Sequence, residues 1–276
     1  MTRTPRRALA AVPVALAVPV ALAMLVALAG CAGGAADGPS EPAPVSTSPE
    51  LSGELTVYAA ASLTAAFDEL AAEFEAANPS VDVLPIVSDG SSTLATQLVE
   101  GAPADVFASA DERTMSTVAD AGLLDGDAEL FATNTLRIAT PAGNPGDVSS
   151  IDDLADPALA VVLCAPEVPC GAASHQLLDL SGVRVAPVSE EQNVTAVLAK
   201  VKAGEADAGL VYATDVAAAG DAVDSIEPEQ ADQVVNRYPI AALAGAADSE
   251  VAAAFVAFVL GDEGRALLAS YGFGSP

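Results

Sequence analysis

The sequence is poor in several residue types on which enzymes and nucleic-acid-binding proteins depend. It has no tryptophan and one histidine, and its 10 lysines and arginines stand against 38 aspartates and glutamates, a formal net charge of −28. A single histidine leaves no plausible Ser/His/Asp set, and the chain has no P-loop, no Gly-x-Gly-x-x-Gly stretch and no cluster with metal-ligand spacing. So acidic a surface makes nucleic acid a poor partner. These absences argue against an enzyme and against nucleic-acid binding.

The first 31 residues are predicted to be a secretory signal that ends at a lipidation site. Three arginines within the first seven residues precede an uncharged apolar run from 8 to 29, and Leu28-Ala29-Gly30-Cys31 closes it. This layout predicts cleavage before Cys31, lipid on that cysteine, and an extracytoplasmic chain anchored to the cell membrane. The alternative is an uncleaved membrane-spanning anchor, because the run is long enough to cross a bilayer. Residues 32–53, dominated by Ala, Gly, Pro, Ser and Thr, are expected to form a flexible tether.

Two cysteines remain once Cys31 is assigned to lipid, namely Cys164 and Cys170. An even pair in an exported protein favours a disulfide. The alternatives are a redox pair, or half of a metal site with His175. The bridge is favoured over both, because the spacing is not Cys-x-x-Cys and no second ligand cluster exists.

Strands and helices alternate through residues 54–276, which are expected to be the folded part. Apolar strands are predicted at 55–59, 81–87 and 183–187, among others, and a helix with a buried face is predicted from Ser62. Such alternation indicates a parallel sheet covered by helices on both faces. The number of units suggests two α/β lobes around a cleft, with ligands expected where strands lead into helices.

Several of these strand-to-helix junctions carry hydrogen-bond donors. Helices are predicted to begin at Ser62, at Ser91 behind Gly90, and after Asn193. A helix N-terminus has N–H groups without intrahelical acceptors and a dipole that favours negative charge. Each junction alone is as easily explained by helix capping, and Tyr212 as a core aromatic. As a set, and with no catalytic constellation, they predict a receptor for a small oxyanion.

Longer stretches of the sequence resemble a known family. Ala59-Ala60-Ala61-Ser62-Leu63-Thr64, Ser91-Ser92-Thr93-Leu94-Ala95 and the block 101–111 closely resemble the molybdate-binding proteins of ABC importers, and Gly209-Leu210-Val211-Tyr212 and Tyr271-Gly272-Phe273 resemble later motifs of that family. The resemblance implies an α/β fold of the two-lobed type II periplasmic-binding-protein class, with mixed, mostly parallel sheets flanked by helices. Lobe 1 would comprise residues 54–133 and 236–276, and lobe 2 residues 134–235, with the ligand in the cleft between them.

The resemblance also implies a ligand, a site and partners. A molybdate or tungstate dianion would be held without any basic side chain by Ser62 and Ser91 (hydroxyl and backbone N–H), the N–H groups of Cys170 and Val194, and the Tyr212 hydroxyl. The family often has a small residue where Cys170 stands, but only its backbone would donate. The chain is then expected to be a monomer and not an enzyme, to need no cofactor, and to deliver its ligand to an ABC permease. The alternatives are a receptor for sulfate or phosphate, and a lipoprotein sensor module.

Overall fold

The computed structural model describes residues 50–276. The expected signal, the lipidation site at Cys31 and all but the end of the expected tether lie outside the described residues. The first strand already includes Ser52 and Gly53, so regular structure begins slightly before the expected boundary. No helix within 50–276 is long and apolar enough to span a membrane.

The centre of the fold is one continuous sheet with the strand order β4-β2-β5-β11-β6-β9-β7-β8, in which β10 also pairs with β6. β1 and β3 form a separate two-stranded parallel sheet. Parallel and antiparallel pairs both occur, so the sheet is mixed. The strands are β1 (Ser52–Leu55), β2 (Val57–Ala60), β3 (Ser80–Val83), β4 (Val87–Asp89), β5 (Val106–Ala108), β6 (Glu129–Pro141), β7 (Val161–Cys164), β8 (Ser189–Glu191), β9 (Ala208–Tyr212), β10 (Val223–Ile226) and β11 (Val235–Ala242).

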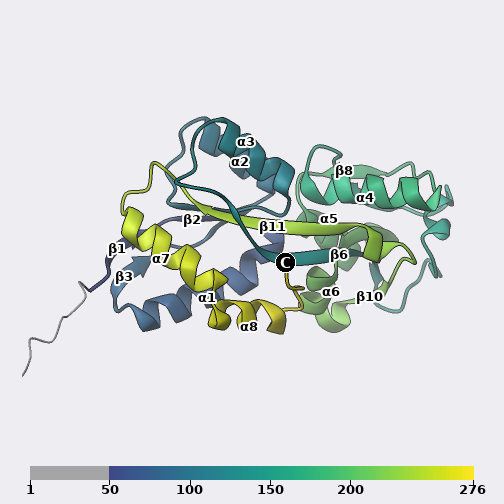
Figure 1. Cartoon of the computed structure of the whole chain (residues 1–276). Coiled ribbons are helices and arrows are strands. Elements are labelled where there is room, and N and C mark those ends of the chain that lie inside the picture. Colours follow the sequence, from purple (N-terminus) through teal and green to yellow (C-terminus); the bar gives the residue numbers. More distant parts are fainter. Residues whose placement is uncertain (1–49) are drawn as a thin grey trace, which may run out of the picture. The chain divides into compact units, whose positions relative to one another are not determined.

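Helices cover both faces of this sheet. They are α1 (Thr64–Ala77), α2 (Ser91–Val99), α3 (Glu112–Asp120), α4 (Pro169–Ser181), α5 (Val194–Lys202), α6 (Ala213–Ala219), α7 (Ser249–Leu260) and α8 (Asp262–Ser270), with the short 3₁₀ turns η1 (Ala61–Leu63), η2 (Asp152–Ala155), η3 (Gly220–Ala222) and η4 (Ala231–Gln233). Over β2 and β5, α2 and α3 lie on one face and α1, α7 and α8 on the other (Figure 1).

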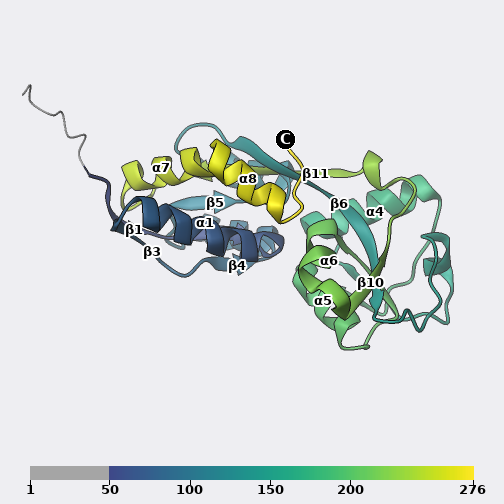
Figure 2. The same ribbon diagram turned by 90° about the horizontal axis from the view of Figure 1, so that it is seen from below.

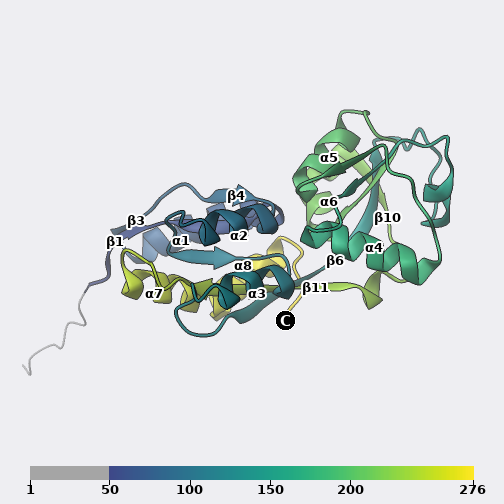
Figure 3. The same cartoon turned by 90° about the horizontal axis from the view of Figure 1, so that it is seen from above.

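Two long strands join two separately packed halves. The first part of β6, 129–135, pairs with β11, and the part from 136 to 141 pairs with β9 and β10. We call the half built on β2, β4, β5 and the end of β11 lobe 1, and the half built on β7, β8, β9 and β10 lobe 2. Figures 2 and 3 show β6 and β11 running from one lobe into the other. The expected changeovers at 133/134 and 235/236 lie within these strands, and the exact division stays a prediction.

The lobes have different cores. Lobe 1 packs aromatic rings edge to face, with Phe67 against Phe131 and Phe255, and Phe74 against Phe255. Lobe 2 is filled mainly by buried Val, Leu and Ile side chains from β6, β7, β9, α4 and α5. Because each lobe buries its own apolar side chains, its internal packing does not depend on the cleft between them.

Two predicted strands differ from the structure. The strand expected over 81–87 is split into β3 and β4, because Pro85 between them has no N–H to donate to a sheet. The strand expected over 183–187 is absent, and β8 forms just after Pro187 instead. Apart from Val81, the apolar residues of both stretches are at most partly buried, and proline decided where the strands lie.

Candidate functional site

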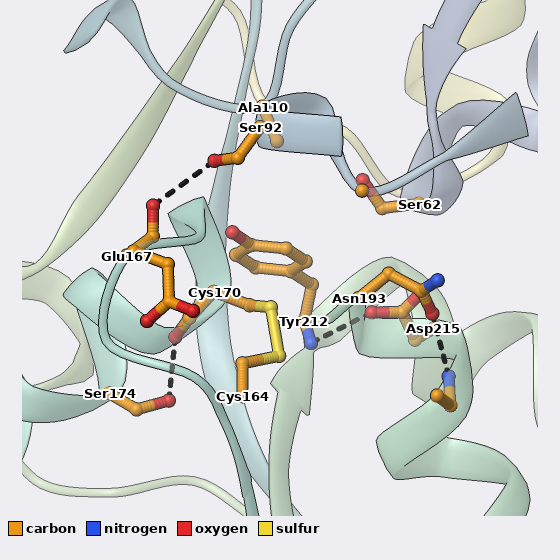
Figure 4. Close-up of a disulfide and its surroundings, with 12 residues drawn as sticks. Ser62, Ser92, Ala110, Cys164, Glu167, Cys170, Ser174, Asn193, Tyr212 and Asp215 are labelled. Atoms are coloured by element: carbon orange, nitrogen blue, oxygen red, sulfur yellow. Dashed lines mark hydrogen bonds between the residues drawn. A yellow bond between two sulfur atoms is a disulfide. The ribbon is translucent and has the colours of Figure 1, made fainter. Parts of the chain in front are cut away.

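A small cavity lies between the lobes, where strands of both lobes lead into helices. It is lined by residues from the β2–η1 junction, the start of α2, the loop after β5, the starts of α4 and α5, and the end of β9 (Figure 4). All five residues expected to hold the ligand are among them. The lining consists of Ala60, Ala61, Ser62, Gly90, Ser91, Ala110, Val168, Pro169, Cys170, Gln192, Asn193, Val194 and Tyr212. Its volume of about 20 Å³ admits only a very small ligand.

Two helices of lobe 2, α4 and α5, begin at this cavity. Pro169 is the first residue of α4, where its missing N–H is no loss, and Cys170 follows it. Val194 is the first residue of α5, whose start is fixed by Asn193 because the Asn193 side chain accepts from the Ala196 N–H at 2.9 Å. Since the first N–H groups of a helix have no intrahelical acceptor, Cys170 and Val194 are positioned to donate to a ligand.

Neighbouring groups prepare the two serine hydroxyls to donate. Ser91 is buried, and its oxygen accepts the Ala110 N–H at 3.0 Å, so its own proton remains free. The Ser62 oxygen lies 3.0 Å from the Tyr238 hydroxyl, which in turn is 3.5 Å from the Asn134 side-chain nitrogen. That nitrogen can only donate, so Tyr238 accepts from it and can give its own proton to Ser62; in that direction the Ser62 proton is left for the cavity.

Tyr212 supplies the clearest sign that a ligand completes the site. Its side chain is 1% exposed, yet its hydroxyl has no hydrogen-bond partner among residues 50–276. A buried polar group left unpaired costs roughly 1–3 kcal/mol, so such groups are rare without a reason. Burial, together with the nearby Tyr238 and Asp215, raises the pKa of Tyr212 well above its ordinary value. The hydroxyl therefore keeps its proton and can donate to an acceptor in the cavity.

A disulfide joins Cys164, at the end of β7, to Cys170 in the first turn of α4 (Figure 4). Both cysteines are buried. With both sulfur atoms bonded to each other, neither is available as a thiolate for a metal half-site with His175. The bridge closes a loop whose last residue is one of the predicted N–H donors.

The same loop is held by lobe 1. The Glu167 carbonyl oxygen accepts from the Ser92 hydroxyl at 3.0 Å and from the Arg113 guanidinium at 2.8 Å. A second contact between the lobes runs from the Asn193 side-chain nitrogen to the Asp89 carboxylate at 2.8 Å. We call these three hydrogen bonds the interlobe contacts.

Close approach of the lobes also requires Gly90. A Cβ built on Gly90 would lie 2.2 Å from the carbonyl oxygen of Gln192 in the other lobe, so only glycine fits in this arrangement. Gly90 has a φ of −56°, which any residue can adopt, and space rather than backbone conformation explains the glycine.

The cavity is neutral and rich in donors. None of its lining residues within the described part of the chain carries a charged side chain. The residues themselves pointed to Ser62, Ser91, the helix start after Asn193 and Tyr212 as members of a donor set, and the resemblance added Cys170 and the role of each as a ligand contact. Sequence reasoning missed Tyr238, Asn134 and Ala110, which orient the hydroxyls, because these contacts join residues far apart in the chain and leave no local signal.

Similarity to known proteins extends over most of the chain. The profile of the family described as "bacterial extracellular solute-binding protein" matches residues 55–274. The molybdate-binding protein ModA of Mycobacterium tuberculosis H37Rv is 48% identical over 222 residues, which are 80% of this chain and 85% of that protein.

Two solved structures share the fold at lower identity. The periplasmic molybdate-binding protein of Azotobacter vinelandii has a TM-score of 0.69 at 23% identity, over 80% of this chain and 99% of that one. The sulfate-binding protein SubI of Mycobacterium tuberculosis H37Rv has the same TM-score at 20% identity, over 80% and 86%. These likenesses confirm the expected two-lobed α/β fold. Because a molybdate-binding and a sulfate-binding protein match equally well, the fold by itself does not identify the anion.

Proposed function

We propose that this chain, which belongs to the family of bacterial extracellular solute-binding proteins, captures molybdate outside the cytoplasm and delivers it to an ABC importer. Membership of that family makes it a binding protein and not an enzyme. The specific ligand is supported by the identity to a molybdate-binding protein and by the chemistry of the cavity.

One observation carries the oxyanion proposal, namely the buried Tyr212 hydroxyl that has no partner in a cavity without charged side chains. A fully ionised oxyanion has only acceptors, so a site made only of O–H and N–H donors matches it. Hydrogen bonds to a charged group are worth roughly 1.5–3 kcal/mol each, so several of them offset the repulsion of a distant acidic surface. A protonated ligand would leave one donor facing another and would bind less well.

Tungstate belongs to the same proposal, because it is a tetrahedral dianion of similar size. Sulfate is smaller, and a cavity fitted to molybdate would leave it with longer, weaker contacts. No cofactor is needed for this function, since binding and release involve no chemical step.

The lipid anchor is part of the proposal and rests on the sequence around Cys31. Lipid on Cys31 would hold the protein, as a monomer, at the outer face of the membrane, and residues 32–53 would let it reach its permease. A labelled fatty acid supplied to the cells should be incorporated into the wild type and not into Cys31→Ala. Absence of label from the wild type would contradict the anchor.

Calorimetry of the purified protein with molybdate, tungstate, sulfate and phosphate tests the ligand. We expect tight one-to-one binding of molybdate and tungstate and at least tenfold weaker binding of the other two, about 1.4 kcal/mol or more of discrimination. Tight binding of sulfate or phosphate without a response to molybdate would instead support the alternative receptor.

A further inference from the structure

We propose that Asp215 couples anion binding to proton uptake: its carboxyl takes up a proton when a dianion enters the cavity, so that affinity rises as pH falls through neutrality. The inference rests on the proposed function, because it requires a dianionic ligand in the described cavity. It assigns a role to a residue that does not line that cavity.

Asp215 lies directly behind the ligand-facing Tyr212. It stands in the first turn of α6, and its carboxylate accepts the backbone N–H of Tyr212 at 2.9 Å (Figure 4). The residue is 7% exposed. A carboxyl held this close to a site residue, and this well shielded from water, is within the electrostatic reach of a bound dianion.

Within the part of the chain that the structure describes, no cation offsets the charge of Asp215. None of the salt bridges among the described residues includes it. The nearest ionisable groups that face it are two tyrosines, Tyr212 at the end of β9 and Tyr238 of β11, and burial raises the pKa of both. These neighbours are neutral, so they leave the charge of an ionised Asp215 unbalanced.

The charged side chains on the other elements packed against α6 are engaged elsewhere or exposed. Arg137 of β6 pairs with Glu227, and Lys200 of α5 pairs with Glu191. On β10, Asp224 accepts the Gly143 N–H. The remaining charged residues of α5 and η3, Lys202 and Asp221, are exposed.

Burial favours the neutral form of Asp215, while the Tyr212 N–H favours the charged form. Burial is the stronger effect and raises the pKa of Asp215 from 3.8 to about 7. In the ligand-free protein the carboxyl is therefore partly protonated near neutral pH. A dianion nearby disfavours the carboxylate further, which raises this pKa again in the bound state.

A second cavity, distinct from the anion cavity, borders Asp215. It has a volume of about 230 Å³ and is lined by Asp215 and Thr214 of lobe 2 and by Tyr271 of lobe 1. It shares Ala61 and Ser62 with the anion cavity. Protons can thus exchange at Asp215 through this cavity.

The sign of the effect follows from linkage. Well below the ligand-free pKa, Asp215 is neutral with or without ligand and affinity is at its maximum. As pH rises through that value, binding must take up a proton and affinity falls, until Asp215 is ionised in both states. The total change is about tenfold for each unit by which the ligand raises the pKa.

Calorimetry of the purified protein with molybdate, from about pH 6 to about pH 9, tests this linkage. Each pH is measured in two buffers of different ionisation enthalpy, which gives the number of protons taken up per ligand. We expect a fraction of a proton near pH 7 to 8 in the wild type and none in Asp215→Asn, whose affinity should not change with pH. The amide oxygen can still accept the Tyr212 N–H, so the turn into α6 should be kept.

Asp207→Asn is the matched control. Asp207 immediately precedes β9, at the opposite end of the strand from Tyr212, and its carboxylate also accepts a backbone N–H, that of Ala160. It should behave as the wild type. Equal proton uptake by the wild type and Asp215→Asn would overturn the inference. So would molybdate binding by the wild type without proton uptake, a result that needs no variant. Absence of molybdate binding at every pH would instead overturn the proposed function.

Discussion

At the scale of single residues, the site depends on hydroxyl groups whose protons are directed by their neighbours. The Ser91 oxygen accepts a hydrogen bond from the Ala110 N–H, and the Tyr238 hydroxyl is placed to donate to Ser62. The Tyr212 hydroxyl, in contrast, has no hydrogen-bond partner among the described residues. An oxyanion in the cavity would accept a hydrogen bond from it. The Tyr212 hydroxyl should therefore destabilise the ligand-free protein and stabilise the complex with the anion.

Replacing Tyr212 by phenylalanine should weaken molybdate binding by roughly 1–3 kcal/mol, the scale of a lost hydrogen bond to a charged group. Because the ligand-free protein also loses an unpaired buried hydroxyl, its melting temperature should stay the same or rise. Calorimetry and thermal unfolding with and without molybdate measure both effects. Tyr271→Phe is the control, since the Tyr271 hydroxyl contacts Glu69 away from the anion cavity. A lower melting temperature with unchanged affinity would assign Tyr212 to the core alone.

Asp215 should also make stability depend on pH. Its pKa is about 7 in the folded protein against an ordinary value of 3.8, so between these values the folded state holds a proton that the unfolded chain has lost. Stability therefore falls as pH rises through this window. Asp215→Asn should be more stable than the wild type at about pH 8, by on the order of a few kcal/mol, and equally stable at about pH 4. Urea unfolding at both pH values measures the difference, and an equal difference at both would exclude titration as its cause.

At the scale of elements, the loop between β7 and α4 serves two purposes. It ends at Cys170, a predicted donor, and it presents the Glu167 carbonyl to Ser92 and Arg113 of lobe 1. The disulfide ties this loop to the end of β7 in lobe 2. The hydrogen bonds from Ser92 and Arg113 tie it to lobe 1. Loss of the bridge should therefore affect folding and binding together.

The double variant Cys164→Ala and Cys170→Ala should lose about 2 kcal/mol of stability, the chain-entropy value for so short a loop. Molybdate affinity should also fall, because the Cys170 N–H is less well positioned. Chemical unfolding and calorimetry give the two values. Ser92→Ala, which removes one interlobe contact and leaves the bridge, separates the two effects. If neither stability nor affinity changes in the double variant, the bridge does not organise the site.

At the scale of the whole molecule, the cavity exists only when the lobes meet, and Gly90 permits that approach. Gly90→Ala should hold the lobes apart without disturbing either core, because the obstructing atom belongs to the other lobe. We expect at least tenfold weaker molybdate binding, about 1.4 kcal/mol, with little change in unfolding midpoint.

Small-angle X-ray scattering with saturating molybdate should show a larger radius of gyration for Gly90→Ala than for the wild type. Gly245→Ala is the matched control, since a Cβ there meets no atom within 4 Å. A compact, tightly binding Gly90→Ala protein would show that the backbone at Gln192 can move aside.

The sequence was informative about local structure and much less so about contacts across the molecule. The helix start at Ser91 was predicted from neighbouring residues, and the alternation of strands and helices indicated the fold class. The helix expected from Ser62 begins instead at Thr64, after the 3₁₀ turn that contains Ser62. The partnership of Ser62 with Tyr238 joins residues 176 positions apart, which no local pattern encodes. Burial of Asp215 arises only when α6 packs against other elements, so its shifted pKa was equally inaccessible from sequence.

The position of β11 sets the order in which this protein can fold. This strand comes from residues 235–242, late in the chain, yet it lies in the middle of the sheet between β5 and β6. Lobe 1 therefore cannot close its sheet until most of the chain has been synthesised, whereas the pairing of β7, β8 and β9 uses only earlier residues. Pairing over such long sequence separations slows folding. Lobe 2 should thus form first and lobe 1 later. A nascent chain shorter than about 240 residues would lack part of β11 and would stay incompletely folded.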